Sequence, residues 1–380
     1  MNSICFIVAT PFTANAFLLE HIKKLSLIYD VTLCANLKLF PIAPEFQGIN
    51  LRIIDIPIER KINIFRDISA LIVLCGLFRK RRFNIVHSIS PKAGLLGMLA
   101  AFINQIEFRV HTFTGQVWVN SNFPQKTFYK ALDYLICRLA TNIFADSQSQ
   151  IDFLVREGVC KKNSITTLGP GSIAGVNLDR FKINPLVRKT YRAAMHASEN
   201  DFVYLFVGRL CRDKGLYDLV AAYRQNHSDL GVDTYLWIVG PDEEGVTAQI
   251  KELYPDLSEK IKWVGRSFEV ENYMAAADVL ILPSYREGFG SVVIEGAACG
   301  IPTIAYETEG IIDAIIHDKT GLLAPKFDIS SLAKLMHLIA INKNIRENLG
   351  ANANDRARQY FSSASVTDAW LTFYKKLLTK

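Results

Sequence analysis

Residues 278–300 read "DVLILPSYREGFGSVVIEGAACG", and this stretch joins three kinds of local pattern. The short apolar run at 278–284 indicates a buried strand, and the glycine-containing run at 285–290 indicates a loop. The residues that follow, 291–300, are expected to form a helix. A strand, a loop and a helix in this order form the repeating unit of a parallel α/β sheet.

The same alternation runs through most of the chain. Short apolar runs that indicate strands lie at 3–9, 30–35, 84–89, 108–113, 142–146, 202–208, 234–240, 261–265, 278–284 and 302–306. Segments with helical spacing separate them, for example 91–105 and 122–139. We therefore predict an α/β fold with two doubly wound Rossmann-like domains, whose strand ends face a cleft.

The alternation pauses near residues 170–200, which are rich in Gly, Asn and Pro and contain no apolar strand. We predict a first domain at 1–175 and a second at 176–360. Residues 328–378 read as consecutive helices, and the segment 361–380 is expected to be a helix that packs back on the first domain.

Composition limits the class of protein. The seven cysteines are scattered without a CxxC pair, a pattern that is typical of a reducing cytosol and argues against a structural zinc site. No apolar run approaches the roughly 20 residues that a membrane span needs. The net charge of +6 is uneven: residues 1–180 hold 20 Lys and Arg against 12 Asp and Glu, and residues 181–380 hold 23 against 25. The resulting balances of +8 and −2 indicate that the first half faces something anionic.

Two cations follow one of the predicted strands. The run "VGRLCRDKG" (207–215) places Arg209 and Lys214 between a strand end and a helix start, where free backbone N–H groups favour anions. This position predicts a diphosphate site, although a solvated basic loop has the same composition. The chain contains no GxGxxG, no Asp-x-Asp and no GxxxxGK[ST] motif, which argues against dehydrogenases, kinases and a metal-bridged diphosphate.

Two glutamates, Glu287 and Glu295, lie seven residues apart in the opening stretch. The first falls in the predicted loop and the second about two turns into the helix, so a rise of about 1.5 Å per residue separates them by roughly 10 Å. Glycosidases need their two carboxyls about 5 Å or about 6.5–9.5 Å apart, so an acid/base pair fits poorly. A clamp on a nucleotide sugar fits better, with helix-start amides facing the phosphates. A surface glutamate is the simpler alternative for Glu295.

The run "EGFGSVVIE" resembles the E-x7-E signature of family 4 retaining glycosyltransferases, which have the GT-B fold. The runs "GRLCRDKG", "GIPTIAYETEGIIDAI" and "TGLL" are similar to further segments of that family. The resemblance covers the second domain closely and the first more loosely. It implies that Arg209 and Lys214 hold the donor diphosphate, that Glu287 contacts the donor sugar and Glu295 the ribose, and that no metal or cofactor is needed. The expected donor-binding set is Arg209, Lys214, Arg266, Gly288, Phe289, Gly290, Ser291, Val292 and Glu295.

The first domain departs from the family pattern after its first strand. Family members often have a Gly-Gly loop there, and this chain has "ATPFTANAF" (9–17). Thr10, Thr13 and Asn15 are the polar residues that could contact an acceptor instead.

A histidine is the second catalytic candidate beside Glu287. The run "VHTFTGQVW" (110–118) places His111 near the end of a strand, where the family often has a histidine close to the reacting sugar. The alternative is a buried histidine bonded to the backbone, and His87 fits that structural role better.

Residues 62–83 combine an apolar helical pattern with the basic run Arg79–Arg82. This helix could pack on the sheet with its cations at the C-terminal end, or lie partly in an anionic membrane interface. Nucleic acid is a weaker candidate because its motifs are absent.

The sequence thus predicts a cytoplasmic glycosyltransferase, peripheral at the inner face of the cell membrane. It would move a sugar from a nucleotide-diphosphate donor to a glycan or polyprenyl-diphosphate-linked acceptor during synthesis of a surface polysaccharide such as O-antigen or capsule. A nucleotide-sugar 2-epimerase of the same fold and a non-catalytic sugar-nucleotide-binding subunit remain alternatives.

Overall fold

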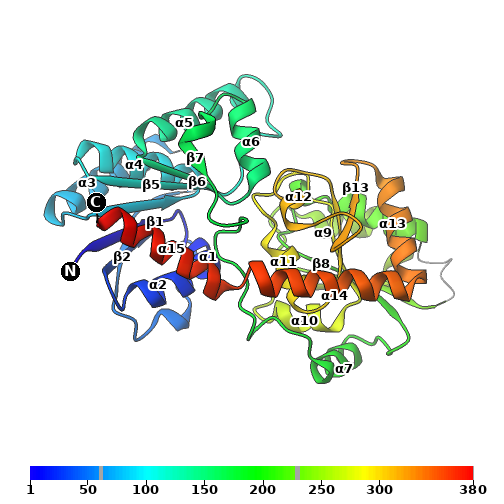
Figure 1. Cartoon of the computed structure of the whole chain (residues 1–380). Coiled ribbons are helices and arrows are strands. Elements are labelled where there is room, and N and C mark those ends of the chain that lie inside the picture. The colour runs from blue at the N-terminus through cyan, green and yellow to red at the C-terminus, as the bar shows by residue number, and fades with distance from the viewer. Residues whose placement is uncertain (60–62, 227–231, 380) are drawn as a thin grey trace. The chain divides into compact units, whose positions relative to one another are not determined.

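The computed structural model describes residues 1–59, 63–226 and 232–379 (Figure 1). The chain forms two compact units: unit 1 comprises Met1–Ala174 with Ser363–Lys380, and unit 2 comprises Gly175–Ser362. The chain therefore enters unit 2 once and returns to unit 1 for its last helix. In the part of the chain that the structure describes, no helix is both long enough and apolar enough to cross a membrane.

Unit 1 is built on a parallel sheet, which has seven strands in the described residues, in the order β3-β2-β1-β4-β5-β6-β7. The strands are β1 Ser3–Ile7, β2 Asp30–Ala35, β3 Leu51–Asp55, β4 Ile85–Ile89, β5 Phe108–Phe113, β6 Asn142–Ala145 and β7 Ile165–Thr166. The helices are α1 Pro11–Phe17, α2 Leu19–Leu25, α3 Ile64–Lys80, α4 Pro91–Ile103, α5 Gln125–Leu139, α6 Gln148–Arg156 and α15 Ser363–Leu378.

Both faces of this sheet are covered, because successive residues of a strand point to opposite faces. In β1, Cys5 and Ile7 belong to an apolar cluster that includes residues of α3, α4 and α5. Ile4 and Phe6 belong to a second cluster with residues of α2 and α15. Strands that are buried on both faces read as continuous apolar runs, which is the pattern that the sequence shows.

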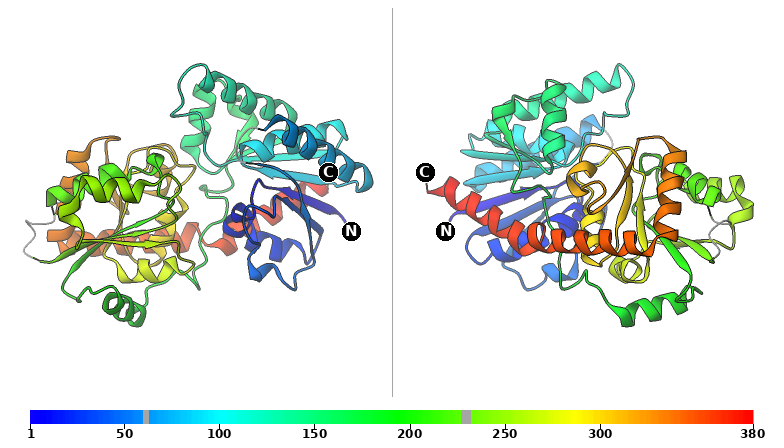
Figure 2. Two further views of the ribbon diagram at one scale, coloured as in Figure 1. Left: turned by 180° about the vertical axis from the view of Figure 1, so that it is seen from behind. Right: turned by 45° about the vertical axis from the view of Figure 1, so that its right-hand side comes forward.

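The last helix, α15, completes the second of these clusters. Trp370 and Tyr374 are buried there, and the Tyr374 hydroxyl lies 2.6 Å from Nδ1 of His87. His21 on α2 contacts Thr367 of α15 at 2.8 Å. Figures 1 and 2 show α15 (red) beside the N-terminal helices (blue) of the same unit.

Unit 2 is built on a second parallel sheet, with six strands in the described residues, in the order β10-β9-β8-β11-β12-β13. The strands are β8 Phe202–Val207, β9 Thr234–Val239, β10 Ile261–Gly265, β11 Val279–Leu282, β12 Thr303–Tyr306 and β13 Gly321–Ala324. The helices are α7 Pro185–Ala194, α8 Leu216–Asn226, α9 Val246–Leu253, α10 Val270–Ala276, α11 Ser291–Ala298, α12 Ile311–Ala314, α13 Ile329–Ile341 and α14 Lys343–Tyr360.

The strand order positions the loops that matter for function. Because all of these strands are parallel, their carboxyl ends meet at one edge of each sheet. In unit 2, β8 lies between β9 and β11, so the loops after these three strands are neighbours. The predicted class, two Rossmann-like α/β domains, is confirmed.

Candidate functional site

The predicted phosphate-binding cations lie at the carboxyl edge of the sheet of unit 2. Arg209 follows β8, and Lys214 ends a short 3-10 helix, η3 (Arg212–Lys214), before α8 begins. Gly215 has a left-handed φ of +68°, and a Cβ atom there would lie 2.0 Å from the backbone oxygen of Pro283. Only glycine therefore lets η3 press against the end of β11, and this contact brings Lys214 to the loop that carries Glu287.

Each of the two cations faces a carboxylate in this structure. Lys214 Nζ donates a hydrogen bond to Oε1 of Glu287, and Arg209 Nη1 donates one to Oε2 of Glu243 at 2.7 Å. Glu243 follows β9, the strand beside β8. The site therefore holds two cations at strand ends with carboxylates as their counter-ions, an arrangement in which an anionic ligand would compete with those carboxylates.

The start of α11 faces the same edge of the sheet. Gly290 is its N-cap residue with a left-handed φ of 81°, and its side-chain space is filled by Ile311, whose Cδ1 would lie 2.6 Å from an added Cβ. Ser291 and Val292 open the helix, and the first N–H groups of a helix have no partner within it. These amides carry the partial positive charge that favours phosphate.

Glu295 lies in the second turn of α11, in surroundings that differ from those of Glu287. Burial raises its pKa to about 7, while the nearby Arg180 acts to lower it and Glu271 to raise it. Arg180 donates a hydrogen bond to Oε2 of Glu271 at 2.8 Å and another to the backbone oxygen of Phe268 at 2.6 Å. The two glutamates of the E-x7-E run thus have different neighbours: a lysine for Glu287, and an arginine–glutamate pair for Glu295.

Two members of the predicted donor set are placed less favourably. The Phe289 side chain is buried and packs against Phe361 at 5.2 Å between ring centroids, so only its backbone could reach a ligand. Arg266 follows β10, the outermost strand on its side, and β9 separates that strand from β8. Its exposed side chain lies at the same edge of the sheet as Arg209, two strands away.

In unit 1, His111 lies two residues before the end of β5 and is fully buried. Its Nδ1 atom lies 2.8 Å from the Ser88 hydroxyl, and its ring fills the space beside Gly94 of α4, where a Cβ would meet Cε1 at 2.4 Å. Burial lowers the pKa of His111 to about 3, against a hydrogen bond with Ser88 that acts to raise it. The ring of His111 therefore lies beneath α4, with Nδ1 held by Ser88 and with Nε2 buried without a hydrogen-bond partner among the described residues.

The predicted acceptor-side residues lie after β1, at the carboxyl edge of the sheet of unit 1. Thr10 is buried, and its hydroxyl has no hydrogen-bond partner among the described residues. Thr13 is partly exposed in α1. The Asn15 side chain donates to the backbone oxygen of Pro41 at 3.0 Å and accepts from the N–H of Ala43 at 3.1 Å, so it holds the loop after β2. Thr13 is therefore better placed to contact a ligand than the buried Thr10 or Asn15, which holds the loop after β2.

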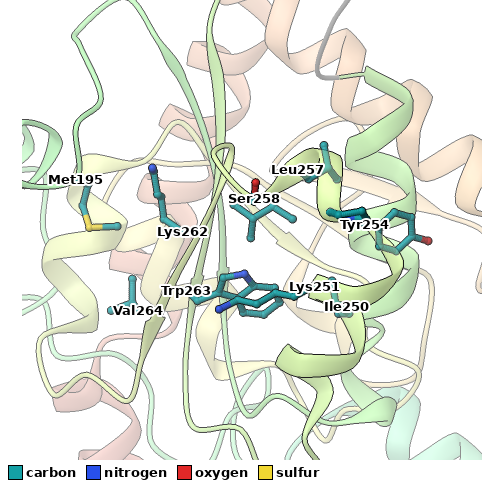
Figure 3. Close-up of a pocket in the computed structure, with 11 residues that line it drawn as sticks. Met195, Ile250, Lys251, Tyr254, Leu257, Ser258, Lys262, Trp263 and Val264 are labelled. Carbon is teal, nitrogen blue, oxygen red and sulfur yellow. The ribbon is translucent and has the colours of Figure 1, made fainter.

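A cavity of about 780 Å³ lies elsewhere in unit 2, beside the edge strand β10 (Figure 3). Met195, residues of α9 and Trp263 of β10 contribute to its lining. None of the predicted donor residues lines it. It is separate from the strand ends that carry Arg209 and Lys214.

Sequence reasoning missed Glu243 and the Arg180–Glu271 pair. Glu243 lies four residues after the end of β9, so the expectation that ligand-binding residues follow strand ends, which selected Arg209, could have found it. Arg180 lies in the irregular segment before α7, and Glu271 in the first turn of α10. No sequence pattern predicts this pair, because the two residues are far apart in the chain. They meet only where the segment before α7 packs against the start of α10.

Residues 187–356 match the family model described as "Glycosyl transferases group 1". These residues lie within unit 2, so the similarity to this family covers most of that unit. Structures of the Anabaena protein HepE in complex with UDP and of a sucrose-phosphate synthase from Thermosynechococcus elongatus share the fold of the whole chain. They have TM-scores of 0.80 and 0.82 and identities of 18% and 21%, and cover 99% and 100% of this chain and 100% of each of theirs. The fold is GT-B.

Two curated relatives extend over most of the chain. A capsular polysaccharide biosynthesis glycosyltransferase, CapM of Staphylococcus aureus, is 29% identical over 326 residues, which are 85% of this chain and 84% of the relative. A UDP-Gal:alpha-D-GlcNAc-diphosphoundecaprenol alpha-1,3-galactosyltransferase of Escherichia coli is 26% identical over 291 residues, 75% of this chain and 73% of the relative.

Proposed function

We propose that this protein is a family 4 retaining glycosyltransferase that moves a hexose from a nucleotide-diphosphate donor to a polyprenyl-diphosphate-linked acceptor. The observation that carries the proposal is the cluster at the carboxyl ends of β8 and β11, where Arg209 and Lys214 meet the loop of Glu287 and the start of α11. Cations and helix-start amides together suit a diphosphate, and the adjoining carboxylate suits sugar hydroxyls.

In this proposal the donor diphosphate displaces the carboxylates of Glu243 and Glu287 from the two cations. The bond between the anomeric carbon and the diphosphate oxygen then breaks, and Arg209, Lys214 and the amides of α11 stabilise the departing anion. The acceptor hydroxyl attacks from the same face of the sugar, and its proton passes to the leaving phosphate oxygen. The configuration at the anomeric carbon is therefore kept, and the cations supply the charge that a metal would otherwise provide.

The proposed roles of the two glutamates follow from the order of sugar, diphosphate and ribose in a nucleotide sugar. Glu287, released from Lys214, accepts hydrogen bonds from the donor sugar, and Glu295 accepts them from the ribose. The relatives named for capsule synthesis and for a diphosphoundecaprenol substrate support a role in surface polysaccharide synthesis and a lipid-linked acceptor. Such an acceptor would place the enzyme at the inner face of the cell membrane, where the +8 balance of residues 1–180 favours anionic lipid.

A thermal-shift panel of UDP-, GDP-, ADP- and dTDP-sugars tests the donor, because a ligand that binds the native state raises the melting temperature. We expect one nucleotide class to stabilise the wild type, with the shift retained in EDTA. The variants Arg209→Ala and Lys214→Ala should lose both the shift and sugar transfer. Arg212→Ala, which removes an exposed cation from the same 3-10 helix, is the matched control and should keep both.

The outcomes also separate the alternatives. Donor that is consumed without any acceptor would indicate the epimerase, and tight donor binding without turnover under any condition would indicate the binding subunit. Near-wild-type transfer by both the Arg209 and the Lys214 variants would rule out the diphosphate site described here.

A further inference from the structure

A groove runs along the open edge of the sheet of unit 2. The strand β10 is the outermost strand on its side, and among the described residues it pairs only with β9. The cavity of about 780 Å³ lies along this strand. It is bounded by α9 and the short 3-10 helix η4 (Pro255–Leu257), and by Met195, directly after α7 (Figure 3). We name this cavity the β10 groove.

The backbone of β10 offers hydrogen-bonding groups to this groove. Successive residues of a strand direct their N–H and C=O groups to opposite neighbours. The Lys260 oxygen accepts from the N–H of Leu236 of β9 at 3.0 Å, so Ile261 and Trp263 direct their groups away from β9. These two residues are about 6.8 Å apart along the strand, which is the repeat of a neighbouring strand. Such a row of outward N–H and C=O groups is a template for pairing with another chain.

The two faces of the groove differ in chemistry. Trp237, the register partner of Lys262 on β9, meets Tyr273 of α10 at 6.3 Å between ring centroids. Lys262 therefore points to the face of the sheet that α10 covers, and Trp263 to the opposite face. The crossovers through α9 and α10 run in opposite directions across the sheet, so α9 covers that opposite face.

The lining on the α9 face is largely apolar and consists of Ile250, Tyr254, Leu257 and Trp263. In Figure 3, Met195 and Lys262 lie to one side of the groove and Ile250 and Tyr254 to the other. A strand laid in the groove would thus meet lysine on one face and apolar side chains on the other.

The two cations of the groove have no counter-ion. Lys251 of α9 and Lys262 both line it, and among the described residues no Asp or Glu does. In the part of the chain that the structure describes, neither lysine forms an ion pair; the Lys262 ammonium lies 5.7 Å from the centroid of the Tyr235 ring. Lys260, by contrast, pairs with Asp233 at 2.6 Å. The charge of the groove is therefore complementary to an occupant that carries carboxylates.

A second copy of this chain fits the groove less well. Pairing of two β10 strands about a two-fold axis at Lys262 would set the two lysines directly opposite each other, and an axis at Ile261 would set Lys262 opposite Lys260. Like charges in opposed positions destabilise a pair of strands. The register of β10 also shifts between Trp263 and Gly265, which shortens any regular pairing. Lysines and bulges keep edge strands from pairing with each other, and an acidic strand is a partner that such an edge still accepts.

We propose that the β10 groove binds an extended acidic segment of another protein, which adds to the sheet as a strand beside β10. The segment would alternate acidic residues, facing Lys262, with apolar residues, facing Trp263. In this kind of recognition, main-chain hydrogen bonds give affinity and the alternate side chains give specificity. An acidic glycan would use the lysines and the aromatic rings but leave the outward backbone groups of β10 unpaired. The inference does not depend on the proposed function, because none of the proposed donor residues lines the groove.

Fluorescence anisotropy with labelled peptides tests this inference on the whole protein. The first peptide alternates Val and Glu, the second alternates Val and Lys, and the third has the composition of the first with Val and Glu in separate blocks. We expect only the first to bind, and its binding to weaken with salt because charge attraction is screened.

N-methylated forms of the first peptide test strand pairing. One form is methylated on every Val nitrogen and the other on every Glu nitrogen. Because the N–H groups of alternate residues in a strand face the same neighbour, one form should lose binding and the other should keep it.

Charge reversal in the groove should reverse the preference for peptide charge. Lys262→Glu should bind the Val–Glu peptide about tenfold more weakly and gain binding to the Val–Lys peptide, since a cross-strand attraction becomes a repulsion. Lys251→Glu makes the same change on the exposed surface of α9 and should also weaken binding of the first peptide. Lys319→Glu is the matched control: it reverses an exposed lysine beside β13, the opposite edge strand, and should bind as the wild type does. Thermal unfolding checks that each variant is folded.

Several results would overturn the inference. They are absence of binding of the Val–Glu peptide up to about 1 mM, equal affinity for the alternating and the block peptide, equal affinity of the two N-methylated forms, and unchanged binding by both groove variants. Tighter binding of an acidic oligosaccharide such as oligogalacturonate, lost in Lys262→Glu, would assign the groove to a glycan instead. A wild-type dimer that the Val–Glu peptide dissociates would assign it to a second copy of the chain.

Discussion

The two glutamates of the E-x7-E run differ in their neighbours, and we expect their losses to differ in kind. Glu287 pairs with Lys214 beside the reacting end of the proposed donor, so Glu287→Gln should lower kcat strongly with a modest effect on donor KM. Glu295 would hold the ribose alike in ground and transition states, so Glu295→Gln should mainly raise donor KM. A hydrogen bond to a charged group contributes about 1.5–3 kcal/mol, or roughly 10- to 150-fold in affinity.

Steady-state kinetics on the two single variants distinguishes this clamp from an acid/base pair. An acid/base pair requires both substitutions to reduce kcat by similar factors and leave donor KM nearly unchanged. Equal losses of kcat would therefore contradict the clamp.

The sequence located the backbone of the candidate site better than it located the side chains. Ligands of parallel sheets bind beyond the carboxyl ends of the strands, and this expectation correctly placed Arg209, Lys214 and Glu287 at one edge of one sheet. It succeeds because it depends only on parallel topology. It could not give side-chain direction. His111 is near a strand end but points beneath α4, and the Asn15 amide is occupied by the loop after β2. Both outcomes depend on tertiary packing that no local pattern encodes.

At the scale of elements, strands that are buried on both faces were predicted to within two residues at each end. Among the strands of the described residues, β3, β7 and β13 were missed. β3 is an edge strand with an exposed Arg52 and Asp55, so its apolar run is interrupted. β7 has only two residues, and β13 only four, in "GLLA". Their pairing with a preceding strand, which is a long-range feature, stabilises them as strands.

Helix α5 carries a buried carboxyl that should make the stability of unit 1 depend on pH. Burial raises the pKa of Asp133 to about 7, although a hydrogen bond from Trp118 Nε1 at 2.7 Å acts to lower it. Between about pH 4 and 7 the unfolded chain loses this proton and the folded chain keeps it. The free energy of unfolding therefore falls as pH rises through that window and levels off above it.

The variant Asp133→Asn should remove this dependence while keeping an acceptor for Trp118. Between pH 5 and pH 8, the wild type should lose about 2 to 3 kcal/mol of unfolding free energy relative to the variant. Urea unfolding at the two pH values measures it. A difference that does not change with pH would show that Asp133 ionises normally in the folded protein.

At the scale of the whole molecule, all of the proposed donor-binding residues lie in unit 2. Calorimetric unfolding should then contain two components, and a bound nucleotide sugar should raise the melting temperature of only one. At a ligand concentration of 100 times Kd the stabilisation of that component is about 2.7 kcal/mol. Equal upward shifts of both components would show that the donor is held by both units.

The return of the chain to unit 1 at Ser363 has a consequence for the order in which the protein can be made. A ribosome releases the chain from its N-terminus, and domains generally fold as they emerge. The residues of unit 2 are all available before α15 leaves the exit tunnel. Until then the surface of unit 1 that receives Trp370 and Tyr374, including Phe6 and Phe144, has no cover. Unit 1 is therefore the first unit to be synthesised and the last to be completed. Nascent chains that end before α15 expose this apolar surface, to which a chaperone would bind.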